Sequence, residues 1–207
     1  MAGQGASVLL MSGGLESATI LWHWKRSARL FPLFVNYGQR GAQMEERASE
    51  KLCSQLEIEL SKFDLSKVGD SFRALQHPTR LHVPVPNRNL LLLALGASYA
   101  SQVGADTLAL TLNKDDLGTY SSSSQSFVNS FRATAAVLDP PIEVVAPLSH
   151  FTKAEVVRFA NDLGVPLSDT YSCMIGRAHH CGRCSQCKLR REAFLSARVS
   201  EPPDFYE

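Results

Sequence analysis

The sequence predicts an α/β protein, with a doubly wound parallel sheet in a single domain that spans residues 1–207. An apolar run at residues 7–11 leads into a Ser-Gly-Gly turn and then into an apolar-periodic helix that begins near Leu15. Further along, short apolar runs alternate with helical segments, which is typical of parallel strands joined by crossover helices. A cysteine cluster adds a knuckle and a last helix at residues 168–198.

The composition is that of a globular protein with no disulfide framework. The chain has 207 residues, a formal net charge of +1 and five cysteines, four of them clustered. A charge so close to zero gives no electrostatic signal for nucleic acid or for a membrane surface. No apolar run reaches the ~18 residues of a membrane span, and the N-terminus lacks the apolar core of a signal peptide. We therefore expect a cytoplasmic protein with reduced cysteines.

The first half of the chain is predicted to contain three strands and two helices. The second helix is strongly charged, and Glu45 and Glu46 are expected on its solvated face. Cys53, near its end, is expected in the core, because a free cysteine behaves as a small hydrophobe. In chain order these elements are the strand at residues 7–11, the helix over 15–27, the strand at 30–35, the helix over 39–55 and the strand at 59–65.

Residues 66–87 divide the two halves. They show weak periodicity and carry three prolines, so they are predicted to be a loop or a lid. In the second half, Thr152 and Glu155 have the spacing of a capping box, and Gly164 ends the helix that they begin. The elements predicted there are the apolar helix over 88–103, the strand at 107–111, the loop at 113–124, the helix over 125–138, the strand at 142–145 and the helix over 152–163.

The turn between the first strand and the first helix predicts an anion-binding loop. Its glycines let backbone N–H groups approach a phosphate closely, and the start of the helix adds about half a positive charge. Ser12 and Ser17 add hydroxyl donors, but the lysine of a Walker P-loop is missing. In a doubly wound sheet such a loop lies beyond the carboxyl end of a strand, where ligands bind. The alternative is an ordinary corner between a strand and a helix.

Four cysteines are spaced C-x7-C-x2-C-x2-C: Cys173, Cys181, Cys184 and Cys187. This spacing supplies four thiolates to one tetrahedral Zn²⁺, so we expect one structural zinc per chain. An accidental group of thiols and a catalytic thiol pair are the alternatives. The surrounding basic residues are expected either to form a solvated face or to contact an anionic ligand: Arg177, Arg183, Lys188, Arg190 and Arg191.

Residues 12–17, Ser-Gly-Gly-Leu-Glu-Ser, resemble the SGGxDS loop of the PP-loop ATP pyrophosphatases, with Glu16 in place of the aspartate. Four further segments make the chain similar to one branch, the QueC family of 7-cyano-7-deazaguanine synthases. Residues 36–40, N-Y-G-Q-R, resemble its D-Y-G-Q-R, and residues 85–89, V-P-N-R-N, resemble its V-P-G-R-N. The segment around 147–155 and the cysteine knuckle also match in order.

The resemblance implies an enzyme that binds ATP with Mg²⁺ and a deazapurine, carries a structural Zn²⁺ and is often a homodimer. It would adenylate the carboxylate of 7-carboxy-7-deazaguanine, releasing pyrophosphate, and transfer the acyl group to ammonia. A second ATP would then convert the amide to the nitrile. The resemblance implies these ATP contacts: Met11, Ser12, Gly13, Gly14, Leu15, Glu16, Ser17, Tyr37, Gln39 and Arg40. The implied catalytic residues are Ser12, Glu16, Ser17, Arg88 and Lys153, and the implied substrate contacts are Arg88, Asn89, Asp116 and Tyr120.

One loop departs from the family pattern D-x3-Y-P-D-C-R. Asp116 and Tyr120 stay in register, but the Asp, Cys and Arg positions are all serine within residues 121–124. The serines predict either a helix-capping loop or a wider and less charged pocket. Because a serine is neither an acid nor a base near neutral pH, we expect nitrile formation to be weak relative to adenylation.

Three functions stay open at this point. The first is a ligase that proceeds to the nitrile. The second stops at the amide and joins the deazaguanine to a protein amine, as would suit QueC-like proteins of bacterial antiphage operons. The third is a zinc-knuckle module that binds nucleic acid, which the near-zero net charge disfavours. A tRNA-thiolating function is also disfavoured, because only Cys53 lies outside the cysteine cluster.

Overall fold

The computed structural model describes residues 5–75, 83–117, 121–201 and 204–207. Five strands form one parallel sheet in the order β3-β2-β1-β4-β5. The chain winds outward from β1 to β3 and then returns beside β1 to continue through β4 and β5, which confirms the doubly wound sheet. The strands are β1 (Ala6–Met11), β2 (Arg29–Asn36), β3 (Ser61–Asp64), β4 (Thr107–Ala109) and β5 (Glu143–Val145).

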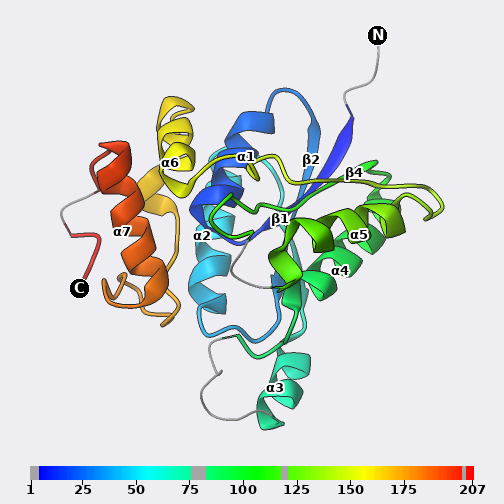
Figure 1. The fold of residues 1–207 in the computed structure, drawn as a ribbon, viewed down its shortest axis with the longest axis horizontal. Helices are drawn as coiled ribbons and strands as arrows, with labels where there is room; N and C mark the ends of the chain where they lie inside the picture. Colours follow the sequence, from blue (N-terminus) through cyan, green and yellow to red (C-terminus); the bar gives the residue numbers. More distant parts are fainter. Residues whose placement is uncertain (1–4, 76–82, 118–120, 202–203) are drawn as a thin grey trace.

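Helices cover both faces of this sheet (Figure 1). One layer packs around Leu9 and Leu21 on one face, and the other packs around Val8 and Leu108 on the opposite face. The first layer contains α1 (Leu15–Trp24), α2 (Ala42–Ser54), α6 (Lys153–Asp162) and α7 (Ser185–Ala197). The second contains α4 (Arg88–Val103) and α5 (Gln125–Ala135). Because both sides of β1 are buried, its sequence is a continuous apolar run rather than an alternating one.

Two local predictions are confirmed in detail. The hydroxyl of Thr152 accepts a hydrogen bond from the Glu155 backbone N–H, and the Glu155 carboxylate accepts one from the Thr152 N–H. This capping box fixes the start of α6 and therefore the direction in which Lys153, its first residue, leaves the helix. Cys53, near the end of α2, is buried in the core, as expected.

Residues 66–87 are predicted to be a loop or a lid, and the structure corrects this prediction for the first part of the segment. Ser66–Ala74 forms α3, which projects away from the sheet layers in Figure 1. Gly69 lets this helix approach the Tyr37 backbone, where a Cβ would lie 2.1 Å from the carbonyl oxygen. Val68 and Phe72 are more than a third exposed, so the apolar side of α3 is only partly covered by the rest of the protein. None of the described helices is long and apolar enough to cross a membrane.

Candidate nucleotide and substrate site

A cavity of about 610 Å³ opens at the carboxyl ends of β1 and β4. These two strands lie where the winding direction of the sheet reverses, which is the place at which doubly wound folds bind ligands. Its floor is apolar and contains Leu33, Val35 and Leu110, while its rim carries polar and charged side chains. A volume of this size suits a small-molecule ligand.

The turn after β1 forms one edge of the cavity. Gly13 has φ +66°, and a Cβ there would lie 2.5 Å from the Glu45 carbonyl oxygen, so only glycine fits. The Ser17 hydroxyl is buried, donates to the Gly14 carbonyl at 3.1 Å and accepts from the Ser12 N–H at 3.3 Å. Ser17 therefore braces the loop from within, whereas Ser12 and Gly14 face the cavity. The first turn of α1 begins at the same edge, and Glu16 in that turn lines the cavity.

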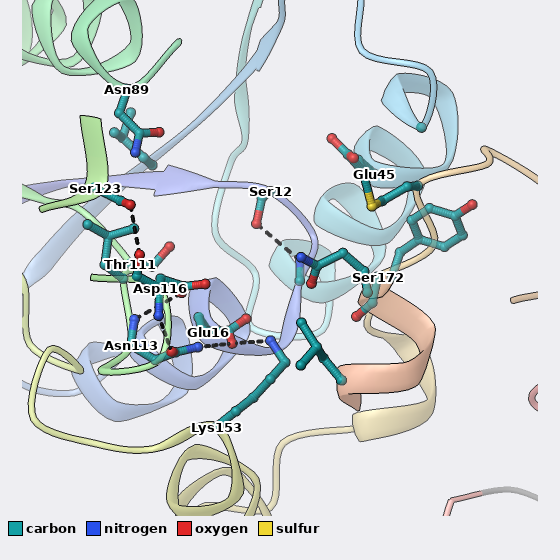
Figure 2. A pocket seen from close by; sticks show the side chains of 18 of the residues that line it. Ser12, Glu16, Glu45, Asn89, Thr111, Asn113, Asp116, Ser123, Lys153 and Ser172 are labelled. Carbon is teal, nitrogen blue, oxygen red and sulfur yellow. Dashed lines mark hydrogen bonds and ion pairs between the residues drawn. The ribbon is translucent and has the colours of Figure 1, made fainter. Parts of the chain in front are cut away.

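Glu16 makes a largely but not fully buried ion pair at this edge. Lys153 Nζ lies 2.5 Å from Glu16 Oε1, and Asn113 Nδ2 donates to the same oxygen at 2.8 Å (Figure 2). Burial acts to raise the pKa of Glu16, but the charge of Lys153 and these hydrogen bonds outweigh it and hold the pKa below its ordinary value. Glu16 is therefore ionised at neutral pH, and Lys153 retains two further N–H donors for a ligand.

The loop after β4 supplies the neighbouring wall. Asp116 accepts a hydrogen bond from the Asn113 backbone N–H at 3.2 Å, and its pKa is raised by burial and by the charge of Glu16. Ser121–Ser123 forms the short helix η2, and Ser124 caps α5 by accepting from the Phe127 N–H at 3.2 Å. The serine run is therefore a helix-capping loop, as one of the two interpretations predicted, and Ser123 also borders the cavity.

The structure brings most of the predicted site residues together around the cavity. Those that line it are Met11, Ser12, Gly14, Glu16, Tyr37, Gln39, Arg88, Asn89, Asp116 and Lys153. Gly13 and Ser17 are buried and are not among the lining residues, and Leu15 is in the core. Arg40 is exposed and is not among the lining residues, while its backbone carbonyl packs against Gly176. Tyr120 lies outside the described residues.

Several lining residues were missed, and the prediction for Glu45 was wrong. Glu45 is not on a solvated face, because the first turn of α2 points it into the cavity, where Gln39 Nε2 donates to it at 2.9 Å. Asn113 was also missed, although its place just after β4 was a usable signal. A third wall comes from the segment that leads into the cysteine knuckle, including Tyr171 and Ser172.

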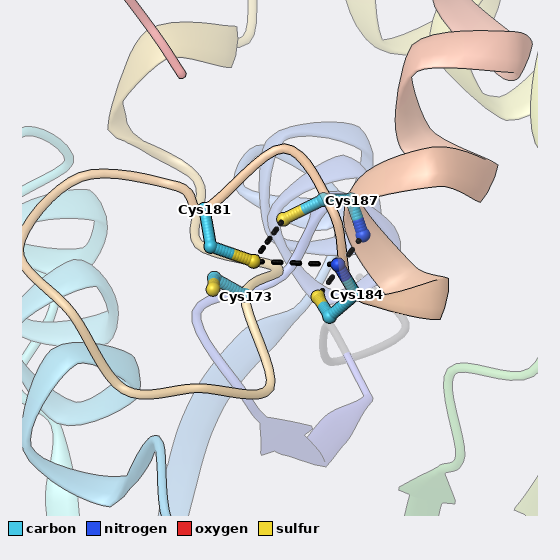
Figure 3. Close-up of side chains that lie close together, drawn as sticks. All are labelled: Cys173, Cys181, Cys184 and Cys187. Carbon is cyan, nitrogen blue, oxygen red and sulfur yellow. Dashed lines mark hydrogen bonds between the residues drawn. The ribbon is translucent and has the colours of Figure 1, made fainter. Parts of the chain in front are cut away.

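The four clustered cysteines converge on one point (Figure 3). Their sulfur atoms all lie within 4.8 Å of one another, and those of Cys181 and Cys187 are 3.9 Å apart. Sulfurs that bind one tetrahedral Zn²⁺ at ~2.3 Å lie about 3.8 Å apart, so the cluster fits a metal ion of this kind. Backbone N–H groups point at two of the sulfurs, Cys181 Sγ and Cys184 Sγ, and would stabilise thiolates there.

Arg190 corrects the prediction of a solvated basic face. Its side chain is fully buried, and its Nε donates to Glu201 Oε1 at 2.6 Å. Its Nη1 and Nη2 hold the Thr170 hydroxyl and the Leu167 carbonyl at 2.7 and 2.9 Å. Arg190 therefore fastens α7 to the segment that leads to Cys173. That segment, and not Arg190 itself, forms part of the cavity wall. That segment also meets the glycine turn after β1, because the Tyr171 N–H donates to the Gly13 carbonyl at 2.7 Å.

The sheet order and the glycine turn beside a charged rim define an α/β protein with the doubly wound fold of the PP-loop class. The NMN synthetase of Francisella tularensis shares this fold with a TM-score of 0.61 and 16% sequence identity, over 99% of this chain and 81% of that one.

The sequence comparisons go further. The family model described as "Queuosine biosynthesis protein QueC" matches residues 6–198. The 7-cyano-7-deazaguanine synthase 1 of Sulfurisphaera tokodaii is 31% identical over 96% of this chain and 97% of its own length. The 7-cyano-7-deazaguanine synthase of Methanobrevibacter smithii is 28% identical over 97% and 98%. The chain belongs to the QueC family.

Proposed function

We propose that this chain is an ATP-dependent, AMP-forming ligase that activates the carboxylate of 7-carboxy-7-deazaguanine and transfers the acyl group to an amine. The observation that carries the proposal is the juxtaposition of the phosphate loop with the Glu16–Lys153 pair at the edge of one large cavity. A carboxylate does not react with an amine near neutral pH. Adenylation gives it a leaving group, because AMP departs when the amine attacks the acyl carbon.

The residues that line the cavity fit adenylation of the carboxylate, the first of the two steps; transfer of the acyl group to the amine is the second. The substrate carboxylate oxygen attacks the α-phosphorus, the bond to the β-phosphate oxygen breaks, and pyrophosphate leaves. Ser12 and the N–H groups at the start of α1 would hold the phosphates, and Lys153 would stabilise the negative charge that develops on them. Glu16 orients Lys153, and Glu16 and Asp116 offer carboxylate oxygens of the type that Mg²⁺ takes. Catalysis would then consist mostly of positioning and charge stabilisation.

The cysteine cluster would hold one structural Zn²⁺, which cross-links the segment before α7 to the start of that helix. We further propose that the chain forms a homodimer, as the family resemblance implies.

Incubation with ATP, Mg²⁺, 7-carboxy-7-deazaguanine and ammonium is expected to yield AMP and pyrophosphate. The reason is that the loop lacks the P-loop lysine that accompanies transfer of the γ-phosphate. The products are measured by chromatography and ³¹P NMR, and a reaction without the deazapurine is the control. ADP as the sole nucleotide product would contradict the proposal.

A second candidate ends at the amide and joins the deazaguanine to an amine on a protein. The serine run favours it, because Ser123 and its neighbours form a capping turn that brings no charged group or thiol to the cavity. Nitrile formation needs the primary amide to stay bound and to be activated again by a second ATP. Residues 121–124, where the family pattern has Asp, Cys and Arg, contribute no acid, base or guanidinium to that step.

Mass spectrometry of the same reaction distinguishes the two outcomes. The amide is expected to accumulate over the nitrile, or a co-expressed protein is expected to gain the mass of the acyl group. Ser123→Cys is a matched variant, since it restores the family thiol at a buried position of similar size, and it should raise the nitrile fraction. Efficient nitrile formation by the unaltered protein, with two ATP consumed per product, would rule out the second candidate.

A further inference from the structure

Glu45 borders the cavity but takes no part in the phosphate loop or in the Glu16–Lys153 pair. It lies in the first turn of α2, and Figure 2 shows it across Ser12 from Glu16 and Lys153. Its Oε1 stands 2.9 Å from the place that a Cβ on Gly41 would occupy. The glycine thus leaves room for the carboxylate to fold back over the start of the helix and face the cavity.

The hydrogen-bonding capacity of Glu45 is only partly used. Gln39 Nε2 donates a hydrogen bond to Glu45 Oε2 at 2.9 Å. Unlike Glu16, Glu45 forms no ion pair within 4.0 Å with a described residue. Burial raises its pKa, although the Gln39 hydrogen bond and the charge of Arg88 act in the opposite direction. Buried carboxylate oxygens are normally satisfied by donors, so a ligand with N–H groups would complete this site.

The surroundings of Glu45 suit a planar ring. Tyr37, Tyr171 and Met174 line the same cavity and offer two aromatic rings and a thioether. Gln39 links the carboxylate to Tyr37, because its Oε1 accepts from the Tyr37 N–H at 2.9 Å while its Nε2 donates to Glu45 at 2.9 Å. Asp116, the other carboxylate with a raised pKa, instead lies beside Glu16 and the phosphate loop.

Donor and acceptor patterns separate the two bases that must bind. An ionised carboxylate has two adjacent acceptors and no donor. The guanine-type edge of a deazaguanine presents a ring N–H beside an exocyclic amino group, which are two adjacent donors. The adenine of ATP presents an acceptor nitrogen beside its amino group, which a carboxylate matches only in part.

We infer that Glu45 recognises the guanine-type edge of the deazapurine and selects it against adenine. The identity of the base rests on the proposed function, whereas the preference for a ring N–H beside an amino group rests on the geometry of Glu45. Its carboxylate would accept both N–H groups while Gln39 holds it in place.

Glu45→Gln tests this inference. The amide can still present its oxygen to Gln39, so the fold is retained, but its NH₂ then faces the two donors of the base. Calorimetry is expected to show binding of 7-carboxy-7-deazaguanine weakened about 10- to 100-fold, with ATP affinity and melting temperature unchanged. The matched control is Glu46→Gln on the outer side of α2, where Glu46 pairs with Lys62, and it should change neither affinity.

A second probe separates this inference from the proposed function. Removing the 2-amino group from the base should weaken binding to the unaltered protein but have little further effect on Glu45→Gln. Plain 7-deazaguanine, which cannot be adenylated, should show the same dependence on Glu45 even if no turnover is found. Normal binding of both bases by Glu45→Gln, or an equal loss of ATP binding, would overturn the inference alone. No binding of either base by the unaltered protein would overturn it together with the proposed function.

Discussion

Lys153→Met is expected to abolish most of the ligase activity and to destabilise the fold. The substitution removes a positive charge from the edge of the cavity where phosphates would lie, and loss of one such group typically slows a reaction about 10²- to 10³-fold. It also leaves Glu16 buried and without its ion-pair partner, which costs about 3 kcal/mol. Steady-state kinetics and thermal or urea unfolding measure the two effects. Lys114→Met, at an exposed neighbouring position, is the control and should change neither.

The pH dependence identifies the cause of the destabilisation. Because the folded-state pKa of Glu16 is lowered, the ion pair contributes stability above the ordinary pKa of a glutamate, and this contribution is lost as the pH falls through the folded value. In Lys153→Met, burial alone would raise the pKa of Glu16, so the deficit should shrink as acid protonates the carboxyl. Lys153→Arg should recover much of the stability but less of the activity. Full activity in Lys153→Met would exclude the assigned role.

Cys184→Ala is expected to remove the metal and to lower the melting temperature by at least about 10 °C. Structural Zn²⁺ contributes its binding free energy directly to folding, and about 1 kcal/mol corresponds to roughly 2–4 °C in a chain of this size. Metal analysis should find one zinc per unaltered chain and none in the variant. Turnover should also be lost, because residues on α7, including Leu189 and Glu192, form part of the cavity wall.

Two controls separate metal loss from other effects of this change. Cys184 is also the N-cap of α7, where its sulfur accepts from the Cys187 N–H, and Cys184→Ser keeps an acceptor for this cap while weakening the soft ligand. Cys53→Ala removes a buried thiol outside the cluster and should leave the metal content unchanged. A chain without zinc, whose melting is also unchanged by a chelator, would contradict the assignment.

Residues whose role is set by nearby sequence were predictable. The apolar run of β1, the turn at Gly13 and the pair of Thr152 with Glu155 each specify local backbone geometry, and the structure shows all three. The cysteine spacing likewise limits the four sulfurs to a small volume. The doubly wound parallel sheet followed from the alternation of strands and helices, since few arrangements of a sheet are compatible with it.

Glu45 and Arg190 could not be predicted, because both contradict what their residue type usually does. A glutamate in a charged helix is normally solvated, and its position over Gly41 depends on how α2 meets the end of β2. A fully buried arginine needs partners from several segments, and Glu201 and Leu167 are not adjacent to it in sequence. Helix α3 was missed for a different reason: Leu65, Val68 and Phe72 recur at helical spacing, but the three prolines of residues 66–87, which all follow the helix, favoured a loop for the whole segment.

The hydrogen bond from Tyr171 to the Gly13 carbonyl has a consequence for synthesis on the ribosome. Gly13 is made directly after β1, whereas the Tyr171 backbone group that supports its carbonyl is made only after all five strands of the described sheet. During translation the early loop has neither this support nor the wall formed by α7. A nascent chain that has not yet reached α7 therefore lacks the complete cavity, and the cavity can close only once Tyr171 and the residues of α7 have been added.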